Sequence, residues 1–170
     1  MADDSPRSLR RFSTRYVESE DRVRLTGKVS EGAPEVVWLT QRLCQRLIPA
    51  LAKWLEEQGA GGAHGELLQV FAQQSARADI IPGPPIRPGG DSRHWVARSV
   101  HLAKRGRGIG LTFAGAGDDS VFVAFTVKGL RQWLSIVYAA YTSGGWPLDA
   151  WPQWIKDAAA ASGKRGSTLH

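Results

Sequence analysis

Residues 23–40 read VRLTGKVSEGAPEVVWLT, and residues 109–126 read IGLTFAGAGDDSVFVAFT. The two stretches align without a gap when the first is shifted by 86 positions, so that residue 23 falls on residue 109. Four aligned pairs are identical: Leu25 with Leu111, Thr26 with Thr112, Val37 with Val123 and Thr40 with Thr126. In each copy, apolar residues alternate with others in two short runs, which is the period of a half-buried strand. Turn-forming residues separate the runs, GAP in the first copy and GAGDD in the second. Each stretch therefore predicts a pair of antiparallel strands, and their recurrence predicts an internal repeat.

A helix is predicted directly after each copy. Thr40 is suited to cap the first helix, because its hydroxyl can accept a hydrogen bond from a free amide of the first turn. The apolar residues that follow recur every three or four positions, which gives one apolar helical face. With one inserted residue the two helices also align, and the alignment pairs Leu43 with Leu130, Leu47 with Leu134 and Trp54 with Tyr141. A strand is predicted before each copy as well, at residues 9–18 and 93–102, where apolar and polar residues alternate.

These elements define the expected fold. We predict an α+β protein made of two internally duplicated β-β-β-α units, whose antiparallel sheets form one pseudo-twofold domain. A chain of 170 residues has the length of one such domain. The expected boundaries are a disordered N-terminus (1–8), a single domain (9–155) with repeats at 9–58 and 93–145, a short helix and a Pro/Gly linker between them (59–92), a Trp-rich closing segment (146–155) and a flexible tail (156–170).

The expected architecture, strands followed by a helix and duplicated in one chain, resembles the whirly and PUR-type modules that bind single-stranded nucleic acid. Those modules have four strands per repeat as a rule, whereas three are predicted in each half here. The resemblance is one of architecture alone, and an architecture does not fix a function.

Composition limits the compartment and the partners. The longest apolar runs are far shorter than the roughly 18 residues that a membrane span needs, and the N-terminal MADDSPRSLRRF lacks the apolar region of a signal peptide. Cys44 is the single cysteine, so no internal disulfide can form. These features predict a cytoplasmic protein with no membrane partner. The net charge of +6 favours an anionic partner, and residues 61–110 carry most of the excess, with seven Lys and Arg against three Asp and Glu.

No catalytic or metal-binding pattern is found in the sequence. The four histidines contain no pair with metal-ligand spacing, and no second cysteine accompanies them, so no metal site is predicted. Cys44 lies on the apolar face of its helix, which indicates a buried structural thiol rather than a nucleophile. Adjacent carboxylates such as Glu56 with Glu57 fall at a helix end or in turns, where they are better explained as solvated side chains than as an acid/base pair. We therefore expect a protein that is not an enzyme and needs no cofactor.

Two clusters of basic residues make nucleic acid the first candidate partner. The candidate contact residues are Arg10, Arg11 and Arg15 in the first half and Arg93, Trp95, Arg98, Lys104, Arg105 and Arg107 in the second. The cations could contact phosphates, and an exposed Trp95 could stack on a base. The alternative interpretation is that these arginines form the solvated face of edge strands and prevent aggregation.

A tryptophan-rich segment near the C-terminus, WPLDAWPQWI at residues 146–155, is a second candidate for binding a partner. Trp146, Trp151 and Trp154 could dock a protein partner, because tryptophans dominate interface energies. They could equally pack over the open end of the sheet and close the core.

The sequence as a whole favours a non-catalytic binding module for single-stranded or flexible nucleic acid. The alternative is an adaptor or assembly subunit, including a homo-oligomer, that docks through the Trp-rich segment or through open sheet edges.

Overall fold

The computed structural model describes residues 6–29, 32–59 and 63–166. The strands in this part are β1 (Arg7–Ser8), β2 (Arg11–Val17), β3 (Arg22–Lys28), β4 (Glu35–Leu39), β5 (His94–Val96), β6 (Ser99–Arg105), β7 (Gly108–Ala114) and β8 (Ser120–Thr126). The helices are α1 (Gln41–Gln58), α2 (Gly65–Ala78), α3 (Val127–Gly144) and α4 (Gln153–Gly166), with a short 3-10 turn at Glu18–Glu20. The protein is therefore α+β, as predicted.

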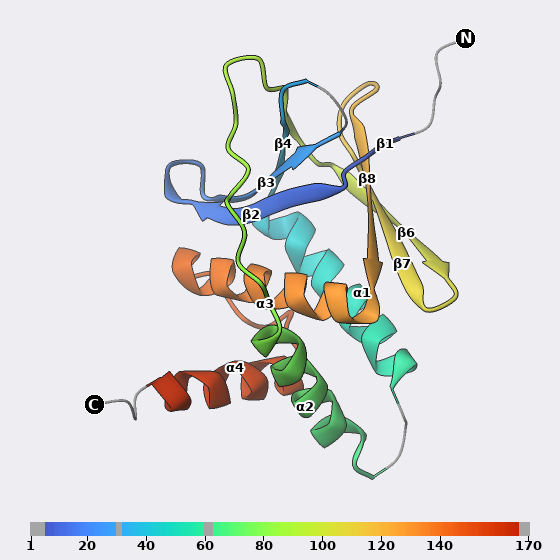
Figure 1. Ribbon diagram of the computed structural model, residues 1–170, viewed down its shortest axis with the longest axis vertical. Coiled ribbons are helices and arrows are strands. Elements are labelled where there is room, and N and C mark those ends of the chain that lie inside the picture. Colours follow the sequence, from blue (N-terminus) through green and yellow to red (C-terminus); the bar gives the residue numbers. More distant parts are fainter. Residues whose placement is uncertain (1–5, 30–31, 60–62, 167–170) are drawn as a thin grey trace.

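The strands form two four-stranded sheets (Figure 1). Sheet A has the order β1-β8-β7-β6, and sheet B has the order β2-β3-β4-β5. In each sheet the three longer strands are antiparallel neighbours that follow one another along the chain. The fourth strand is short, runs parallel to its neighbour and comes from the other half of the chain: β1 pairs with β8, and β5 pairs with β4.

Both sheets are therefore mixed, which corrects the prediction of antiparallel sheets built from three strands each. The segment expected to form one strand at 93–102 is divided at Ala97 and Arg98, and its two parts belong to different sheets. In the same way, β1 lies in residues 7–8, which were expected to be disordered, and the chain passes into β2 through Leu9 and Arg10. Alternation of apolar and polar residues indicates a strand but does not show which sheet the strand joins. Residues 1–5 lie outside the described part.

Leu9 anchors the passage of the chain from sheet A to sheet B. It is buried, and its amide donates a hydrogen bond of 2.8 Å to the carbonyl of Phe122. A β-carbon at Gly27 would lie only 2.8 Å from the Leu9 side chain, so the glycine on β3 provides the space that Leu9 fills.

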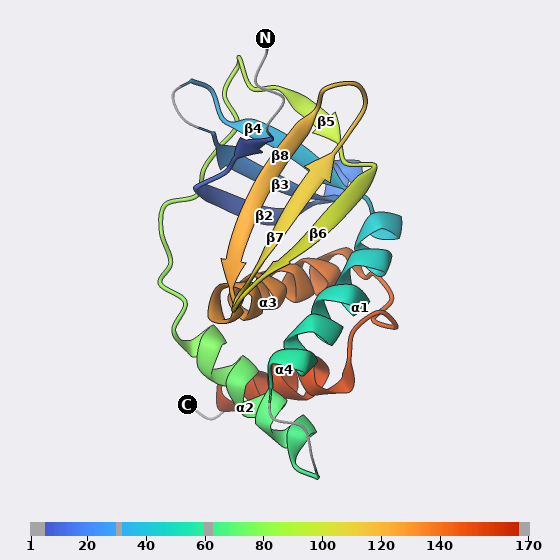
Figure 2. The same cartoon turned by 90° about the vertical axis from the view of Figure 1, so that its right-hand side faces the viewer.

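Helices α1 and α3 begin where the sequence predicted. Thr40 Oγ1 accepts a hydrogen bond of 3.2 Å from the Leu43 amide, and Thr126 Oγ1 accepts one of 3.0 Å from the Gly129 amide. Figure 2 shows α3 below the strands and α1 running downward beside β6, and α3 packs against β2. The core between helices and sheets is made of the apolar residues that alternate in the strands and line the helix faces, among them Leu25, Val37, Leu51, Leu111, Val123 and Leu134.

Helices α2 and α4 pack against each other and form a further layer at one end of the molecule (Figure 1). The structure confirms the short helix predicted before the Pro/Gly linker. It corrects the flexible tail expected from residue 156, because α4 extends to Gly166. The alanines at 158–161 have the highest helix propensity of all residues, and Ala158 is buried. Residues 167–170 lie outside the described part. No helix in the described ranges is long and apolar enough to cross a membrane.

Candidate nucleic-acid interface

The outer face of sheet B is defined by the side-chain alternation of its strands. Leu25 and Val37 point into the core and are fully buried. Arg24 is next to Leu25 on β3, and Trp38 is next to Val37 on β4. Because neighbouring side chains of a strand alternate, both point to the opposite face. This outer face lies away from α1 and α3, on the upper side of the molecule in Figure 1.

A row of cations and aromatic rings crosses this face. The strand register places Arg15 of β2 beside Arg24 of β3, and Arg24 beside Trp38 of β4. The Trp38 ring stacks on the ring of His94 from β5, with centroids 6.2 Å apart and an interplanar angle of 29°. Arg11 and Lys28 form a second basic pair at one end of the face. Neighbouring strands are about 4.8 Å apart, so the row offers two guanidinium groups and then two rings within a short distance.

The arginines of this row have no acidic partner. Within the described ranges, no carboxylate oxygen lies within 4 Å of the guanidinium of Arg15 or Arg24. Burial lowers the pKa of Arg24, and the positive charge of Arg15 lowers it further. The Nε atom of Arg24 is buried and has no hydrogen-bond partner in the described structure. Like charges directly opposite each other across two strands are destabilising, so this pair does not stabilise sheet B.

The outer face of sheet A has a different character. Three successive rows across it carry no Lys, Arg, Asp or Glu: Ser99–Ala114–Ser120, His101–Thr112–Phe122 and Ala103–Gly110–Ala124. The Phe122 ring covers Gly110, where a β-carbon would lie 2.4 Å from it. Arg105, in the next row at the end of the hairpin, is the basic residue of β6 on this face, whereas the outer face of sheet B carries several basic side chains along β2 and β3.

The Pro/Gly linker covers part of the outer face of sheet B. Ile86 is buried there, and its amide donates a hydrogen bond of 2.7 Å to Ser13 Oγ. Arg11 Nη2 donates one of 2.6 Å to the Pro84 carbonyl. Thr26 and Val36, which share the row of Ser13, are buried as well. The linker thus occupies this row and leaves the adjacent row of Arg15, Arg24 and Trp38 partly open.

A groove of about 400 Å³ continues from this face around the edge strand β2. Arg15 borders it on one side and Arg77, at the end of α2, borders it on another. Small side chains of α3 form its floor, among them Ser135, Ala139 and Ser143. No carboxylate lines the groove, so Arg15 and Arg77 give it a positive rim.

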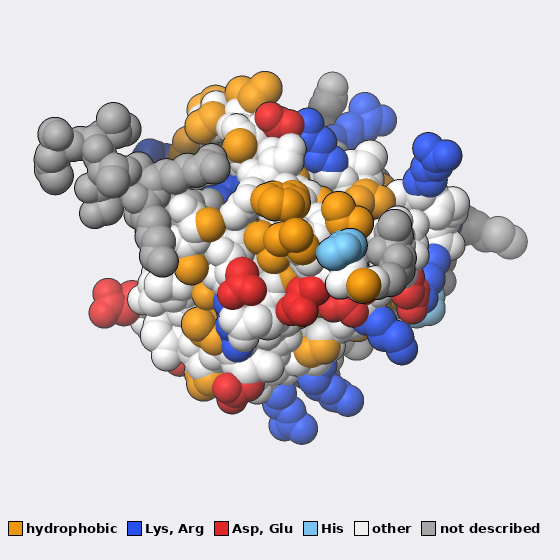
Figure 3. All heavy atoms as spheres, turned by 90° about the horizontal axis from the view of Figure 1, so that it is seen from below, with side chains coloured by type: hydrophobic (Ala, Val, Ile, Leu, Met, Phe, Trp, Pro, Cys, Tyr) orange, Lys and Arg blue, Asp and Glu red, His pale blue; other side chains and the backbone are white. Residues whose placement is uncertain are grey.

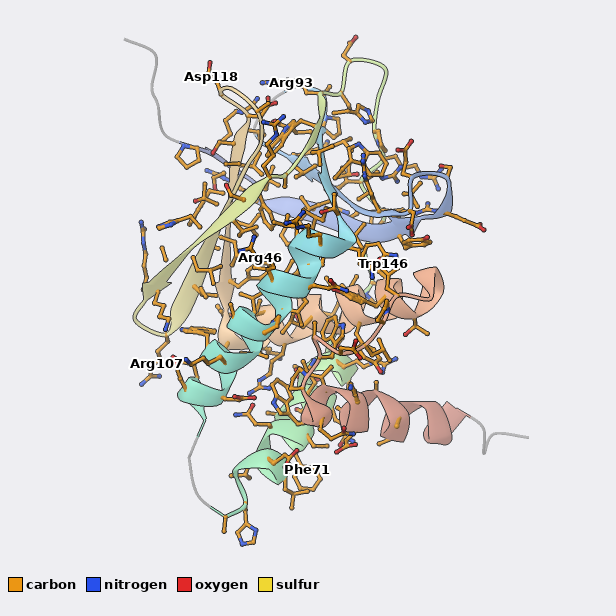
Figure 4. All side chains as sticks on the ribbon, turned by 180° about the vertical axis from the view of Figure 1, so that it is seen from behind. Arg46, Phe71, Arg93, Arg107, Asp118 and Trp146 are labelled. Carbon is orange, nitrogen blue, oxygen red and sulfur yellow. The ribbon has the colours of Figure 1, made fainter. Side chains whose placement is uncertain are left out.

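The structure separates the basic residues that the sequence had grouped together. Arg10, Arg11 and Arg15 are exposed and lie in or just before β2. In the second half, Arg93 pairs with Asp119, and Lys104 pairs with Glu57 at 3.2 Å. Arg98, Arg105 and Arg107 are exposed. Arg98 precedes β6, whereas Arg105 and Arg107 lie at the far end of that strand, so the length of β6 separates them. Figure 4 shows Arg93 and Arg107 at opposite ends of the β6–β7 hairpin. The second cluster therefore does not form one patch.

Trp95 is not an exposed stacking residue. It is 7% exposed, belongs to the core, and its Nε1 donates a hydrogen bond of 2.7 Å to Glu35 Oε1. The ring available on this sheet is Trp38, which sequence reasoning did not select. The signal was present in the sequence, because Trp38 lies between the apolar residues Val37 and Leu39 and so belongs to the opposite face of the strand. Arg24, between Val23 and Leu25, could have been found by the same alternation.

The Trp-rich segment lies in the core. Trp146, Trp151 and Trp154 are all at most 5% exposed. The Tyr141 ring contacts the rings of Trp146 and Trp151 edge to face, with centroids 5.0 and 5.2 Å away. The Trp154 Nε1 donates a hydrogen bond of 2.9 Å to Glu56. Of the two interpretations that the sequence left open, the structure supports packing against the core, because the rings are not accessible to a partner.

Cys44 is buried, as expected, and burial raises the pKa of its thiol to about 12. Such a thiol is not a nucleophile at neutral pH. In the ranges that the structure describes, no group of three or more His, Cys, Asp or Glu side chains is placed to hold a metal ion.

Helix α2 presents three large apolar side chains to solvent and two glutamines to the protein. Leu67, Leu68 and Phe71 are 52%, 50% and 56% exposed, whereas Gln69 and Gln73 are buried. Figure 3 shows the molecule from below, with hydrophobic side chains gathered at the centre of this face. Figure 4 shows Phe71 pointing outward. This pattern is the reverse of an ordinary surface helix.

Comparison with known proteins identifies no relative: no family model, no curated protein and no solved structure matches this chain.

Proposed function

We propose that this protein is a non-catalytic binding module for single-stranded or flexible nucleic acid, and that the outer face of sheet B is its contact surface. The observation that carries the proposal is the row formed by Arg15, Arg24 and Trp38, in which two adjacent guanidinium groups lack any acidic partner in the described structure. Phosphate groups would remove the repulsion between the arginines and provide acceptors for them.

Each member of the row has a separate task in this proposal. Arg15 and Arg24 bind consecutive phosphates, and the positive groove beside β2 continues the path of the backbone past Arg77. Trp38, held by its stacking contact with His94, supplies a surface on which a base can stack. Base stacking on an aromatic side chain is insensitive to sequence, so we expect little discrimination between bases. Unpaired bases are required, because a base inside a duplex is not accessible to Trp38.

We also infer that the chain arose by internal duplication of a β-β-β-β-α unit with approximate twofold symmetry. Each sheet combines three antiparallel strands of one half with a short parallel strand from the other half. Thr40 and Thr126 cap the following helices in the same way. Four strands per half agree better with the whirly and PUR-type pattern than the three predicted from the sequence. The charge of the outer faces differs between the halves, so the proposed site uses only one of the two sheets.

The test is a salt titration of binding to a labelled single-stranded oligonucleotide, followed by fluorescence anisotropy. Replacing both row arginines (Arg15→Gln with Arg24→Gln) should weaken binding and lower the slope of log affinity against log salt by about 0.7 for each phosphate that the variant no longer neutralises. Trp38→Leu should weaken binding by about 1–3 kcal/mol and leave the slope unchanged, because it removes stacking without a charge.

The matched control is Arg105→Gln with Arg107→Gln, which makes the same change in charge at the end of the β6–β7 hairpin. This control should retain wild-type affinity apart from a small general effect of net charge. The proposal is refuted if the wild-type protein does not bind single strands at low salt. Equal losses in the two double variants would also refute it, because the effect would then come from net charge alone.

An adaptor or assembly subunit is the second candidate function, and the apolar outer face of α2 favours it. The occupant to be tested is a second copy of this chain. A twofold contact uses the same patch on both subunits, so Leu67, Leu68 and Phe71 would contribute six large apolar side chains to it. Sedimentation at rising protein concentration should then show a dimer that Leu68→Ser with Phe71→Ser abolishes. A monomer at all concentrations excludes self-association through α2.

A further inference from the structure

A second groove, of about 330 Å³, lies between α1 and the edge strand β6. Leu43 and Leu47 line it from α1, and Val100 and Leu102 line it from β6. Two arginines also line it, Arg46 on α1 and Arg98 directly before β6, together with Ala50 and Ser99. Figure 4 shows Arg46 on the part of α1 that lies near the sheets. The groove therefore combines an apolar floor with two cations.

The charge in this groove has no acidic partner. Arg46 and Arg98 are both exposed, and in the described ranges neither has a carboxylate oxygen within 4 Å. None of the residues that line the groove is Asp or Glu. The arginines can bind phosphate, and the leucine and valine side chains can accept the apolar face of a base. A nucleotide unit offers both chemistries at once.

The groove lies close to the point where the chain leaves sheet B, because Arg98 lines it. The last residues of that sheet are in β5, and the amide of Ala97 donates a hydrogen bond of 2.9 Å to the Trp38 carbonyl. Arg98 is the next residue, and its amide donates one of 2.8 Å to the Ala114 carbonyl of sheet A. The chain thus leaves sheet B beside Trp38 and brings Arg98 to the entrance of the groove. Figure 2 shows the start of α1 close to the point where β5 gives way to β6.

We infer that the groove between α1 and β6 is a second subsite for the same nucleic-acid strand. A strand bound by Arg15 and Arg24 passes Trp38, crosses β5 and enters the groove, where Arg98 and Arg46 bind further phosphates. This inference rests on the proposed function, and it defines the ligand more narrowly. The preferred ligand is a single strand long enough to reach from sheet B into the groove, and a shorter strand occupies only the sheet.

The test compares single-stranded homopolymers of increasing length, within the range of about 4 to 16 nucleotides that small single-strand-binding folds cover. Wild-type affinity should rise with length in two steps, the second when the strand reaches the groove. Arg46→Gln with Arg98→Gln should keep wild-type affinity for the shortest strands and lose the second step. For the longest strands, this variant should also have a salt slope lower by about 1.4, which is about 0.7 for each of two phosphates.

The control is again Arg105→Gln with Arg107→Gln, on the same hairpin but outside the groove. It should show both steps. Unchanged affinity for the shortest strands demonstrates that the groove variant is folded. The inference is overturned if the groove variant binds long strands like the wild type, or if it loses affinity equally at every length.

These outcomes differ from a failure of the proposed function. If no strand of any length binds the wild type, or if Arg15→Gln with Arg24→Gln has no effect on the shortest strands, the sheet site itself is wrong. If the sheet variant abolishes binding and the groove variant changes nothing, only the second subsite is wrong.

Discussion

At the scale of single residues, Asp21 joins the turn between β2 and β3 to the end of α3. Its backbone is left-handed, with φ of 47°. Its Oδ1 accepts hydrogen bonds from the Tyr16 hydroxyl at 2.6 Å and from Trp146 Nε1 at 2.8 Å. The bond from Tyr16 and then the bond from Trp146 lower the pKa of the Asp21 carboxyl, and the same bond to Asp21 raises the pKa of Tyr16 to about 12.

The lowered pKa of Asp21 gives a prediction about acid. A carboxylate whose pKa is lower in the folded than in the unfolded state stabilises the fold above the unfolded pKa, and this contribution is lost as the pH falls from about 4 toward the folded value. Asp21→Asn keeps an oxygen acceptor and tolerates the left-handed backbone. Urea unfolding should show the variant to be less stable than the wild type at pH 7, with a difference that shrinks at about pH 3. A difference that is constant with pH would mean that the charge of Asp21 is unimportant.

At the scale of elements, α2 is held by two buried glutamines as well as by the apolar contacts of Val70 and Ala76. Gln73 Nε2 donates hydrogen bonds of 2.8 Å to the Arg131 carbonyl and to Ser135 Oγ. Gln69 Oε1 accepts a hydrogen bond of 2.5 Å from Arg131 Nη2. The Arg131 guanidinium is buried, has no carboxylate within 4 Å in the described ranges, and lies 5.4 Å from the Trp154 ring centroid. Gln69 is therefore the acceptor that Arg131 uses on α2.

Removing this acceptor should destabilise the protein more than removing an exposed leucine. Gln69→Ala leaves the buried guanidinium short of a partner and should lower the free energy of unfolding by about 1–3 kcal/mol. Leu67→Ser, on the exposed side of the same helix, should change it by less than about 0.5 kcal/mol. Thermal or urea unfolding of dilute protein measures both. A larger loss for Leu67→Ser would contradict this account and would indicate that the outer face of α2 is covered in solution.

At the scale of the whole molecule, the two sheets are joined by one buried carboxylate. Glu35 of β4 is buried, and its Oε1 accepts a hydrogen bond of 2.6 Å from Arg7 Nη2 and one of 2.7 Å from Trp95 Nε1. Arg7 lies in sheet A, whereas Glu35 and Trp95 lie in sheet B. The same carboxylate thus satisfies Trp95 and holds the short strand β1 in the sheet formed by the other half of the chain.

Arg7→Ala should therefore destabilise the fold through Glu35. The variant leaves a buried carboxylate with one of its two donors, and we expect a loss of about 1–3 kcal/mol in the free energy of unfolding. Arg93→Ala is the control. Arg93 is 86 positions after Arg7, which is the shift that aligns the two halves of the sequence, and its pair with Asp119 is exposed. It should cost at most about 1 kcal/mol. Equal effects of the two substitutions would show that the link through Glu35 does not hold the sheets together.

Most of the local structure could be predicted from the sequence, because it depends on residues close together in the chain. The alternation in residues 23–40 and 109–126 predicted β3, β4, β7 and β8, and the helical spacing after each predicted α1 and α3. Thr40 was recognised as a helix cap because the hydrogen bond it makes is local. The buried position of Cys44 followed from the apolar helix face on which it lies.

The candidate site could be predicted only in part. Arg11 and Arg15 were found as exposed cations, but Trp95 was selected as the exposed ring and Trp38 was not. The error has a physical cause. Alternation assigns residues 93–102 to one strand with two faces, whereas the chain breaks at Ala97 and enters another sheet. Trp95 therefore points inward with the core of sheet B, although it was expected to be exposed.

By itself, the sequence determined the longer strands β2, β3, β4, β7 and β8, the helices α1, α2 and α3, and the basic character of the strand surfaces. The tertiary structure decided which strands become neighbours, and so where Arg15, Arg24, Trp38 and His94 meet on one face. It also decided that the tryptophans of residues 146–155 are buried and that the leucines of α2 are not. The reason is that side-chain periodicity is a local property, whereas the pairing of β1 with β8 and of β5 with β4 depends on contacts between distant parts of the chain.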